Sequence, residues 1–190
     1  MGFSPPPLIS FLMSKVFVVS DTWFNRPMDD DPNTNIVDYN DSIIQNWNNT
    51  VKMDDDVYVL GGFGISDLYH ILIRLNGRIH FLDNYYIDDE KSFITQMKRE
   101  IMNSSTPDLL DRIIFEKKQI MSLNKLDVIL SYFPLSDWFG KNNGTFCFHG
   151  LNENMNLTEH DISCMMNKWE NTPIDIENVK ENILAFENDL

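Results

Sequence analysis

Hydrophobic and polar positions alternate along the chain in a way that predicts buried strands separated by amphipathic helices. The apolar, β-branched runs at 15–21 (KVFVVSD) and 57–61 (VYVLG) are typical of buried strands. Between them, apolar side chains recur every three or four residues, which predicts a helix over 38–51 with one apolar face. That face carries Tyr39, Ile43, Ile44, Trp47 and Val51.

The rest of the chain continues this alternation and then becomes richer in strands. After 61 the pattern predicts a short helix over 66–75, a strand over 78–84, a helix around 93–101 and a further turn or two within 107–114. The second half predicts two strands around the turn at 123–125, strands at 144–150 and 161–169, and a closing helix over 176–186 capped by Asp175. Strands that alternate with helices, followed by a strand-rich half, predict a layered α/β sandwich of two sheets.

Length and composition indicate one globular domain over 13–190, preceded by an extension or arm at 1–12. The 190 residues are 43% hydrophobic, which is enough for a sizeable core. The stretch MGFSPPPLISFL lacks the basic start and the uninterrupted apolar run of a signal peptide. Cys147 and Cys164 fit neither a disulfide framework nor a zinc motif, so we expect buried free thiols and a cytoplasmic protein.

The formal charge of -14 argues against a nucleic-acid partner, because phosphate backbones are bound through clustered lysine and arginine. No apolar run is long enough to span a membrane. We therefore expect neither nucleic acid nor membrane as a partner.

Polar side chains follow several predicted strands, at the edge where open α/β sheets usually place their functional crevice. Those that could converge are Asp21, Asp83, Asn84, His149 and Glu153. Each has a structural alternative: Asp21 and Asn84 could cap turns, and His149 could be a hydrogen-bonded core residue.

The order of these motifs resembles the calcineurin-like metallophosphoesterase family, especially its small bacterial and phage-type members. The likeness runs from about residue 15 to 183. VFVVSDTWF is similar to the family's opening strand ending D-x-H-F, DDDVYVLGGFG to D-x-V-Y-x-L-G-D-F, and LNGRIHFLDNYY to L-N-G followed by G-N-H-D. VILSYFPLSDW stands for L-S-H-x-P-L, FHGLNEN for H-G-H-x-H, and TPIDIENVKENI for the closing helix. The resemblance implies a four-layer α/β/β/α sandwich of two mixed sheets flanked by helices.

The same resemblance implies that most of the metal site is gone. Active members hold two divalent metals that activate a water and clamp the phosphoryl oxygens. Asp21 and Asn84 match ligand positions, and Glu153 could substitute for a lost one. The family's ligand or proton-donor residues are replaced at five positions: Trp23, Gly62, Tyr85, Tyr132 and Leu151.

These substitutions predict a catalytically degenerate phosphoesterase-fold protein that acts as an interaction or structural module. No catalytic residues and no cofactor are expected, beyond one weakly bound divalent cation (Mn, Mg or Ca) at Asp21, Asn84 and Glu153. The partner would be a protein or a second copy, held through the arm or through aromatic side chains of the crevice. The alternative is a phosphomono- or phosphodiester hydrolase with a remodelled single-metal site. The Asn/Asp/Ile-rich composition hints at a phage protein, in which case the location would be the host cytoplasm.

Overall fold

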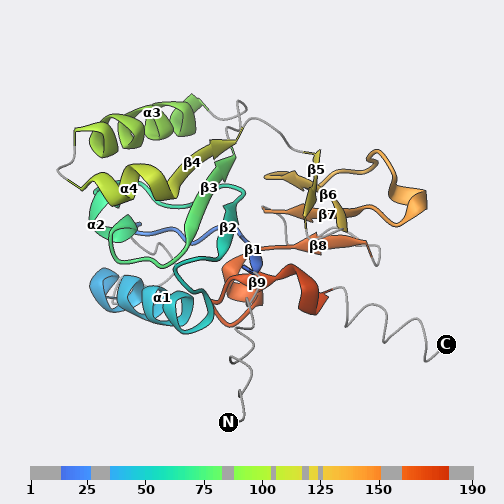
Figure 1. Cartoon of the computed structure of the whole chain (residues 1–190), viewed down its shortest axis with the longest axis horizontal. Coiled ribbons are helices and arrows are strands. Elements are labelled where there is room, and N and C mark those ends of the chain that lie inside the picture. Colours follow the sequence, from blue (N-terminus) through green and yellow to red (C-terminus); the bar gives the residue numbers. More distant parts are fainter. Residues whose placement is uncertain are drawn as a thin grey trace, which may run out of the picture.

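Two β-sheets lie face to face in the computed structural model, and helices cover the outer face of the first sheet (Figure 1). The structure describes residues 14–26, 35–82, 88–103, 106–116, 120–123, 126–150 and 160–179. The predicted arm at 1–12 and the predicted site residues Asp83, Asn84, Tyr85, Leu151 and Glu153 lie outside these ranges.

The first sheet has five strands in the order β4-β3-β2-β1-β9. Its strands are β1 (Val16–Val19), β2 (Asp56–Val59), β3 (Arg78–Leu82), β4 (Ile113–Glu116) and β9 (Ile174–Asp175). Strands β1 to β4 are parallel, whereas β9 is antiparallel to β1. The parallel arrangement brings the carboxyl ends of β1, β2 and β3 to one edge, where functional residues were predicted.

The second sheet has the order β5-β6-β7-β8 and is also mixed. Its strands are β5 (Ile120–Leu123), β6 (Leu126–Ser131), β7 (Phe146–His149) and β8 (Asp161–Ser163). The pair β5–β6 is antiparallel, and β6, β7 and β8 are parallel. The predicted α/β architecture of two mixed sheets with helices is confirmed.

The helices form the crossover connections between the parallel strands. They are α1 (Ile36–Thr50), α2 (Leu68–Leu72), α3 (Asp88–Met102) and α4 (Pro107–Arg112). The Asn35 side chain caps α1 by accepting a hydrogen bond from the Val37 amide at 3.0 Å. Trp47, on the predicted apolar face, is fully buried and donates from Nε1 to the Asn76 carbonyl at 3.0 Å.

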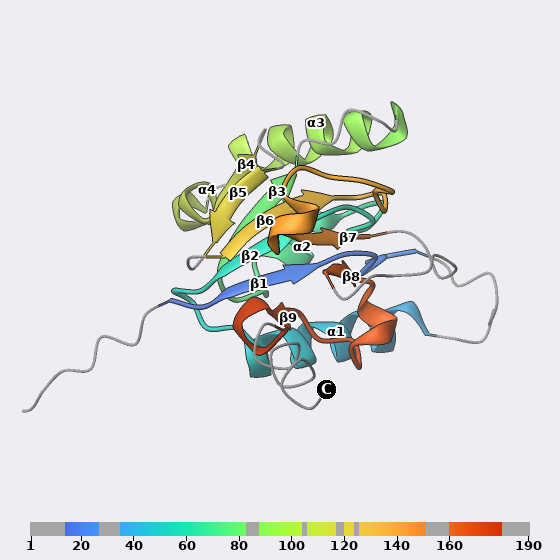
Figure 2. The same ribbon diagram turned by 90° about the vertical axis from the view of Figure 1, so that its right-hand side faces the viewer.

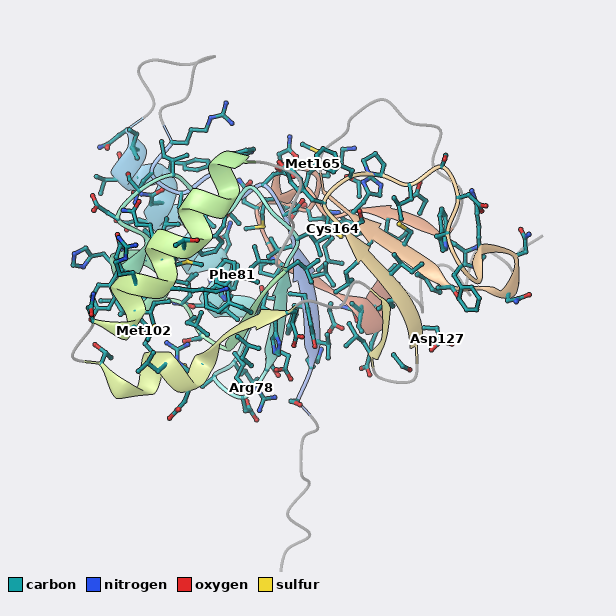
Figure 3. All side chains as sticks on the ribbon, turned by 90° about the horizontal axis from the view of Figure 1, so that it is seen from above. Arg78, Phe81, Met102, Asp127, Cys164 and Met165 are labelled. Atoms are coloured by element: carbon teal, nitrogen blue, oxygen red, sulfur yellow. The ribbon has the colours of Figure 1, made fainter. Side chains whose placement is uncertain are left out.

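Alternation along each strand builds two large cores. Phe17, Val19 and Phe81 point toward the helices, whereas Val18 and Leu60 point toward the second sheet. Figure 3 shows these layers from above, with Phe81 on the helical side and Cys164 between the sheets. Both cysteines are buried and free, as predicted.

Two parts of the prediction need correction. The expected strand at 161–169 ends at Ser163, because Met165 bridges to Ser20 and the chain then turns through a 3-10 helix, η2 (Met166–Lys168). Strand β4 was not predicted, because its IIFE run follows α4 without a turn residue and reads as the end of that helix. The closing helix is described only over 176–179; the Asp175 carboxylate caps it, as predicted, by accepting from the Glu177 amide at 3.0 Å.

The outer face of the second sheet differs from the expected helical layer. In the described part of the chain, residues 132–145 cover this face as a loop with one 3-10 turn, η1 (Lys141–Asn143). Trp138 packs there against Ile129 and Cys147, and its Nε1 donates to the Thr145 carbonyl at 2.8 Å. The Trp138 indole and the loop that holds it thus cover the apolar patch formed by Ile129 and Cys147.

No helix among the described residues is long and apolar enough to cross a membrane.

A charged network links strands β2, β3 and β4 on the inner face of the first sheet. Arg78 donates to both carboxylate oxygens of Asp56, at 2.8 and 2.5 Å. His80 lies between Asp56 (2.8 Å) and Glu116 (3.1 Å) and stacks on Tyr58. Burial opposes ionisation of Asp56, but the hydrogen bonds from His80 and Arg78 outweigh it and lower the pKa to about 2.

This network predicts acid-dependent loss of stability. The folded-state pKa of Asp56 lies below its unfolded value of about 3.9, so its ionised form stabilises the fold above that pH and this contribution is lost as pH falls toward 2. Between about pH 4 and 2, we expect wild type to lose roughly 1–2 kcal/mol more than Asp56→Asn does. Urea denaturation across this range tests the prediction, with the exposed Asp127→Asn as control. Equal losses in wild type and Asp56→Asn would contradict it.

Candidate functional site

The ends of strands from both sheets meet at one place. The Ser20 amide donates to the Cys164 carbonyl at 2.9 Å, and the Met166 amide donates back to the Ser20 carbonyl at 3.1 Å. The Asp21 amide donates to the Gly61 carbonyl at 3.0 Å. Figure 2 shows the end of β1 beside β8. The edges of the two sheets are therefore joined at the predicted crevice.

Asp21 is held by protein groups on both of its carboxylate oxygens. The side chain is only 6% exposed. The Ser20 hydroxyl donates to Oδ2 at 2.8 Å, and the Tyr132 hydroxyl donates to Oδ1 at 3.2 Å. Burial raises the pKa of Asp21, although these two hydrogen bonds oppose the rise. A cation binding here would compete with two donors already in place.

Tyr132 fills the space between two glycines from different sheets. A Cβ on Gly150 would lie 2.7 Å from the Tyr132 ring, and a Cβ on Gly61 would also collide with that ring. The residue is 3% exposed, so its ring is part of the interior. The resemblance puts a histidine ligand at this position, and in the structure the tyrosine that stands there packs its ring against the two glycines and brings its hydroxyl to Asp21.

Gly62 leaves no room for the carboxylate that the family would carry at its position. Its φ is 61°, in the left-handed region that favours glycine. A Cβ here would lie 2.5 Å from Asp21 Oδ1 and 3.0 Å from Asp21 Cα. The Asp21 side chain therefore occupies the space toward which a side chain at position 62 would point.

Trp23 is half-buried and lies two residues after Asp21. Its backbone is left-handed, with a φ of 48°, and its amide donates to the Gly62 carbonyl at 2.9 Å. The Arg26 guanidinium lies 4.4 Å from the centre of its ring. The Trp23 indole therefore makes a cation–π contact with Arg26 of the same chain.

His149 belongs to a buried polar group on β7 and β8. It is fully buried, and its Nδ1 lies 2.7 Å from the Gly150 carbonyl oxygen. Its Nε2 lies 3.4 Å from Asp161 Oδ1, and Ser163 is in register with His149 on the neighbouring strand. The interpretation of His149 as a hydrogen-bonded core residue agrees with this position. Asp161 and Ser163 were missed, although their alternation in DIS places both on one face of β8.

The predicted cation site can be placed only in part. Asp21 lies buried at the end of β1, whereas Asn84 and Glu153 fall outside the described residues. Within the described ranges, no group of three or more His, Cys, Asp or Glu side chains could hold a metal ion. The described residues thus bring together Asp21, Tyr132 and the glycines, and no set of metal ligands.

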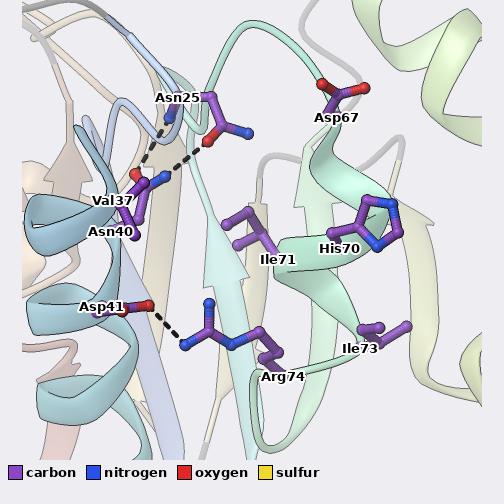
Figure 4. Close-up of a pocket in the computed structure, with 9 residues that line it drawn as sticks. All are labelled: Asn25, Val37, Asn40, Asp41, Asp67, His70, Ile71, Ile73 and Arg74. Atoms are coloured by element: carbon purple, nitrogen blue, oxygen red, sulfur yellow. Dashed lines mark hydrogen bonds and ion pairs between the residues drawn. The ribbon is translucent and has the colours of Figure 1, made fainter.

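A separate hollow of about 350 Å³ opens between α1 and α2 (Figure 4). Ile71 is the buried apolar residue in its wall, and exposed Val37 and Ile73 also line it. On one side the Asn40 amide donates to Asn25, and on the other Arg74 pairs with Asp41 at 2.6 Å. Asp67 and His70 also line the hollow, so its wall mixes apolar and polar groups.

Comparisons with known proteins agree with the fold. No family model matches the chain. Over 79 residues the chain is 35% identical to the uncharacterized protein MJ1445 of Methanocaldococcus jannaschii. That match covers 37% of this chain, and the chain spans less than half (45%) of that relative's length. A crystal structure of the protein of unknown function AQ665 from Aquifex aeolicus is similar, with a TM-score of 0.61 at 16% identity, over 88% of this chain and 98% of that one. At this identity the likeness concerns the fold alone.

Proposed function

We propose that this chain is a catalytically degenerate protein of the calcineurin-like metallophosphoesterase fold, serving as an interaction or structural module. One observation carries the proposal: the Tyr132 ring lies between Gly61 and Gly150, and its hydroxyl donates to Asp21. A side chain that coordinates nothing in its neutral form thus stands where a catalytic site would need space for metal and substrate.

Two further features support the proposal. The space at Gly62 is already taken by Asp21, so a carboxylate bridging two metals has no place. The surrounding fold is consistent with the proposal, with Trp47 buried in α1 and parallel strands ending near Asp21. Loss of ligands within a retained framework is the pattern expected when a fold is kept for its surface.

The alternative is a phosphomono- or phosphodiester hydrolase with one metal ion held by Asp21, Asn84 and Glu153. One buried carboxylate at the end of β1 favours it, because a hard divalent cation prefers oxygen ligands. In this reading Tyr132 would have to leave Asp21 when metal binds. The chain's net charge of -14 would not attract a phosphate ester.

Metal binding tests both readings. Chelator-stripped full-length protein would be dialysed against millimolar Mn²⁺ or Zn²⁺, with metal content measured by elemental analysis and hydrolysis followed with p-nitrophenyl phosphate and its diester. We expect metal near background and no hydrolysis that depends on Asp21. One ion per chain that is lost in Asp21→Ala, together with Mn²⁺-dependent hydrolysis, would overturn the proposal in favour of the alternative.

A further inference from the structure

Asparagine is followed by glycine at 76–77 and again at 143–144. Such a pair is chemically labile, because glycine has no side chain to keep its backbone nitrogen away from the side-chain carbon of the preceding asparagine. Attack by that nitrogen closes a succinimide ring and releases ammonia. Both pairs start with the same local chemistry, so their surroundings in the fold decide which of them can react.

Asn76 and Gly77 are held on both sides by the protein. The Asn76 side-chain amide donates to the Val51 carbonyl at 3.0 Å, and the Asn76 backbone amide donates to the Asn48 side chain at 2.8 Å. The Gly77 carbonyl accepts from Arg112 at 2.7 Å, and Gly77 itself is buried. Ring closure at Asn76 would first have to break these hydrogen bonds, so this pair is protected.

Asn143 and Gly144 lie at the end of the 3-10 turn η1, on the surface. Both residues are exposed, and no group in the described part of the chain bonds the Asn143 side chain. Gly144 has a left-handed backbone with a φ of 83°, and a Cβ there would meet nothing within 4 Å. The peptide that joins them therefore has open space in which to rotate until the Gly144 nitrogen faces the Asn143 side-chain carbon.

The turn around Asn143 holds the loop that covers the outer face of the second sheet. The Gly140 carbonyl accepts from the Asn143 amide at 2.8 Å and from the Thr145 amide at 3.0 Å. The Thr145 carbonyl in turn accepts from Trp138 Nε1 at 2.8 Å, and Trp138 packs against the buried Cys147. A change in backbone length between 143 and 145 therefore disturbs the contacts that keep Trp138 in place.

We propose that Asn143 is a site of spontaneous deamidation, and that the product loosens this loop over Cys147. The Gly144 nitrogen attacks Asn143 Cγ, the new N–C bond replaces the Cγ–Nδ2 bond, and the departing ammonia carries away the proton of the Gly144 amide. Water then opens the succinimide at either carbonyl, giving aspartate or isoaspartate. Isoaspartate adds one methylene to the main chain, which displaces the hydrogen bonds accepted by the Gly140 carbonyl. This inference does not depend on the proposed function.

Ageing of the full-length protein tests the proposal. The protein would be incubated at mildly alkaline pH and mapped by tandem mass spectrometry, with fragmentation that distinguishes aspartate from isoaspartate. In the same samples, alkylation of each cysteine by iodoacetamide would be followed. The matched control is Asn143→Gln, which keeps an exposed amide but would have to close a larger ring that forms more slowly.

We expect deamidation at Asn143 to be at least about tenfold faster than at Asn76, because the hydrogen bonds of Asn76 must open first. Cys147 should be alkylated about tenfold faster in aged wild type than in aged Asn143→Gln, whereas Cys164, between the sheets, should stay unreactive. An Asn143 that stays as intact as Asn76 would overturn the proposal. Isoaspartate at 143 with unchanged alkylation of Cys147 would overturn its second half, the loosening of the loop.

Discussion

Gly62→Asp, which introduces the carboxylate found here in the phosphoesterase family that the sequence resembles, should destabilise the protein strongly and create no metal site. The new Cβ would lie 2.5 Å from Asp21 Oδ1, on a backbone with a φ of 61°. A left-handed residue other than glycine costs about 1 kcal/mol, and overpacking in the interior costs about 1–3 kcal/mol more. A second carboxylate beside a buried one adds repulsion. We expect a loss of roughly 3–5 kcal/mol, measured by urea denaturation.

Gly144→Asp is the matched control for this substitution. Gly144 also has a left-handed backbone, with a φ of 83°, but a Cβ there would meet nothing within 4 Å. It should therefore carry only the backbone cost, about 1 kcal/mol. The expectation would be contradicted if Gly62→Asp were as stable as Gly144→Asp, or if it bound Mn²⁺ tightly. Either result would indicate that the residues around Asp21 can rearrange to hold a metal ion.

The elements with strong periodicity were predictable, and those made by tertiary pairing were not. β1, α1 and β2 followed from an apolar run, a helical face and a second apolar run, because each pattern reflects burial of the segment itself. β4 and β9 depend on a neighbour instead: Ile113 pairs with Ile79, and Ile174 pairs with Val18. The local sequence does not distinguish such short strands from a helix end or a loop.

The candidate site likewise has parts that the sequence could predict and parts that it could not. Asp21 and the glycines could be found because a strand end followed by small or acidic residues is a local signal. The position of Tyr132 could not, because its contacts with Gly61 and Gly150 join residues from two different sheets. The pairing of His149 with Asp161 likewise depends on the register of β7 against β8, which is set by the fold as a whole.

Tyr132→Ala should show how much of the protein's stability rests on the filled crevice. Removing a buried aromatic ring costs about 3–5 kcal/mol when the surroundings cannot collapse. Here Gly61 and Gly150 have no side chains to move into the space. Tyr132→Phe is the matched control, since it keeps the ring and removes only the hydroxyl that donates to Asp21, for about 1 kcal/mol. Urea denaturation compares the two variants.

Tyr132→Ala also tests whether removing the ring leaves a cavity that can bind a small molecule. A hole lined by glycine backbone and capped by the Asp21 carboxylate should admit phenol, which replaces both the ring and its hydroxyl donor. Phenol should therefore raise the stability of Tyr132→Ala with increasing concentration while leaving wild type unchanged. If Tyr132→Ala loses no more than Tyr132→Phe and ignores phenol, the ring is not packed between the two glycines. The crevice would then be open, and the hydrolase alternative would become the stronger reading.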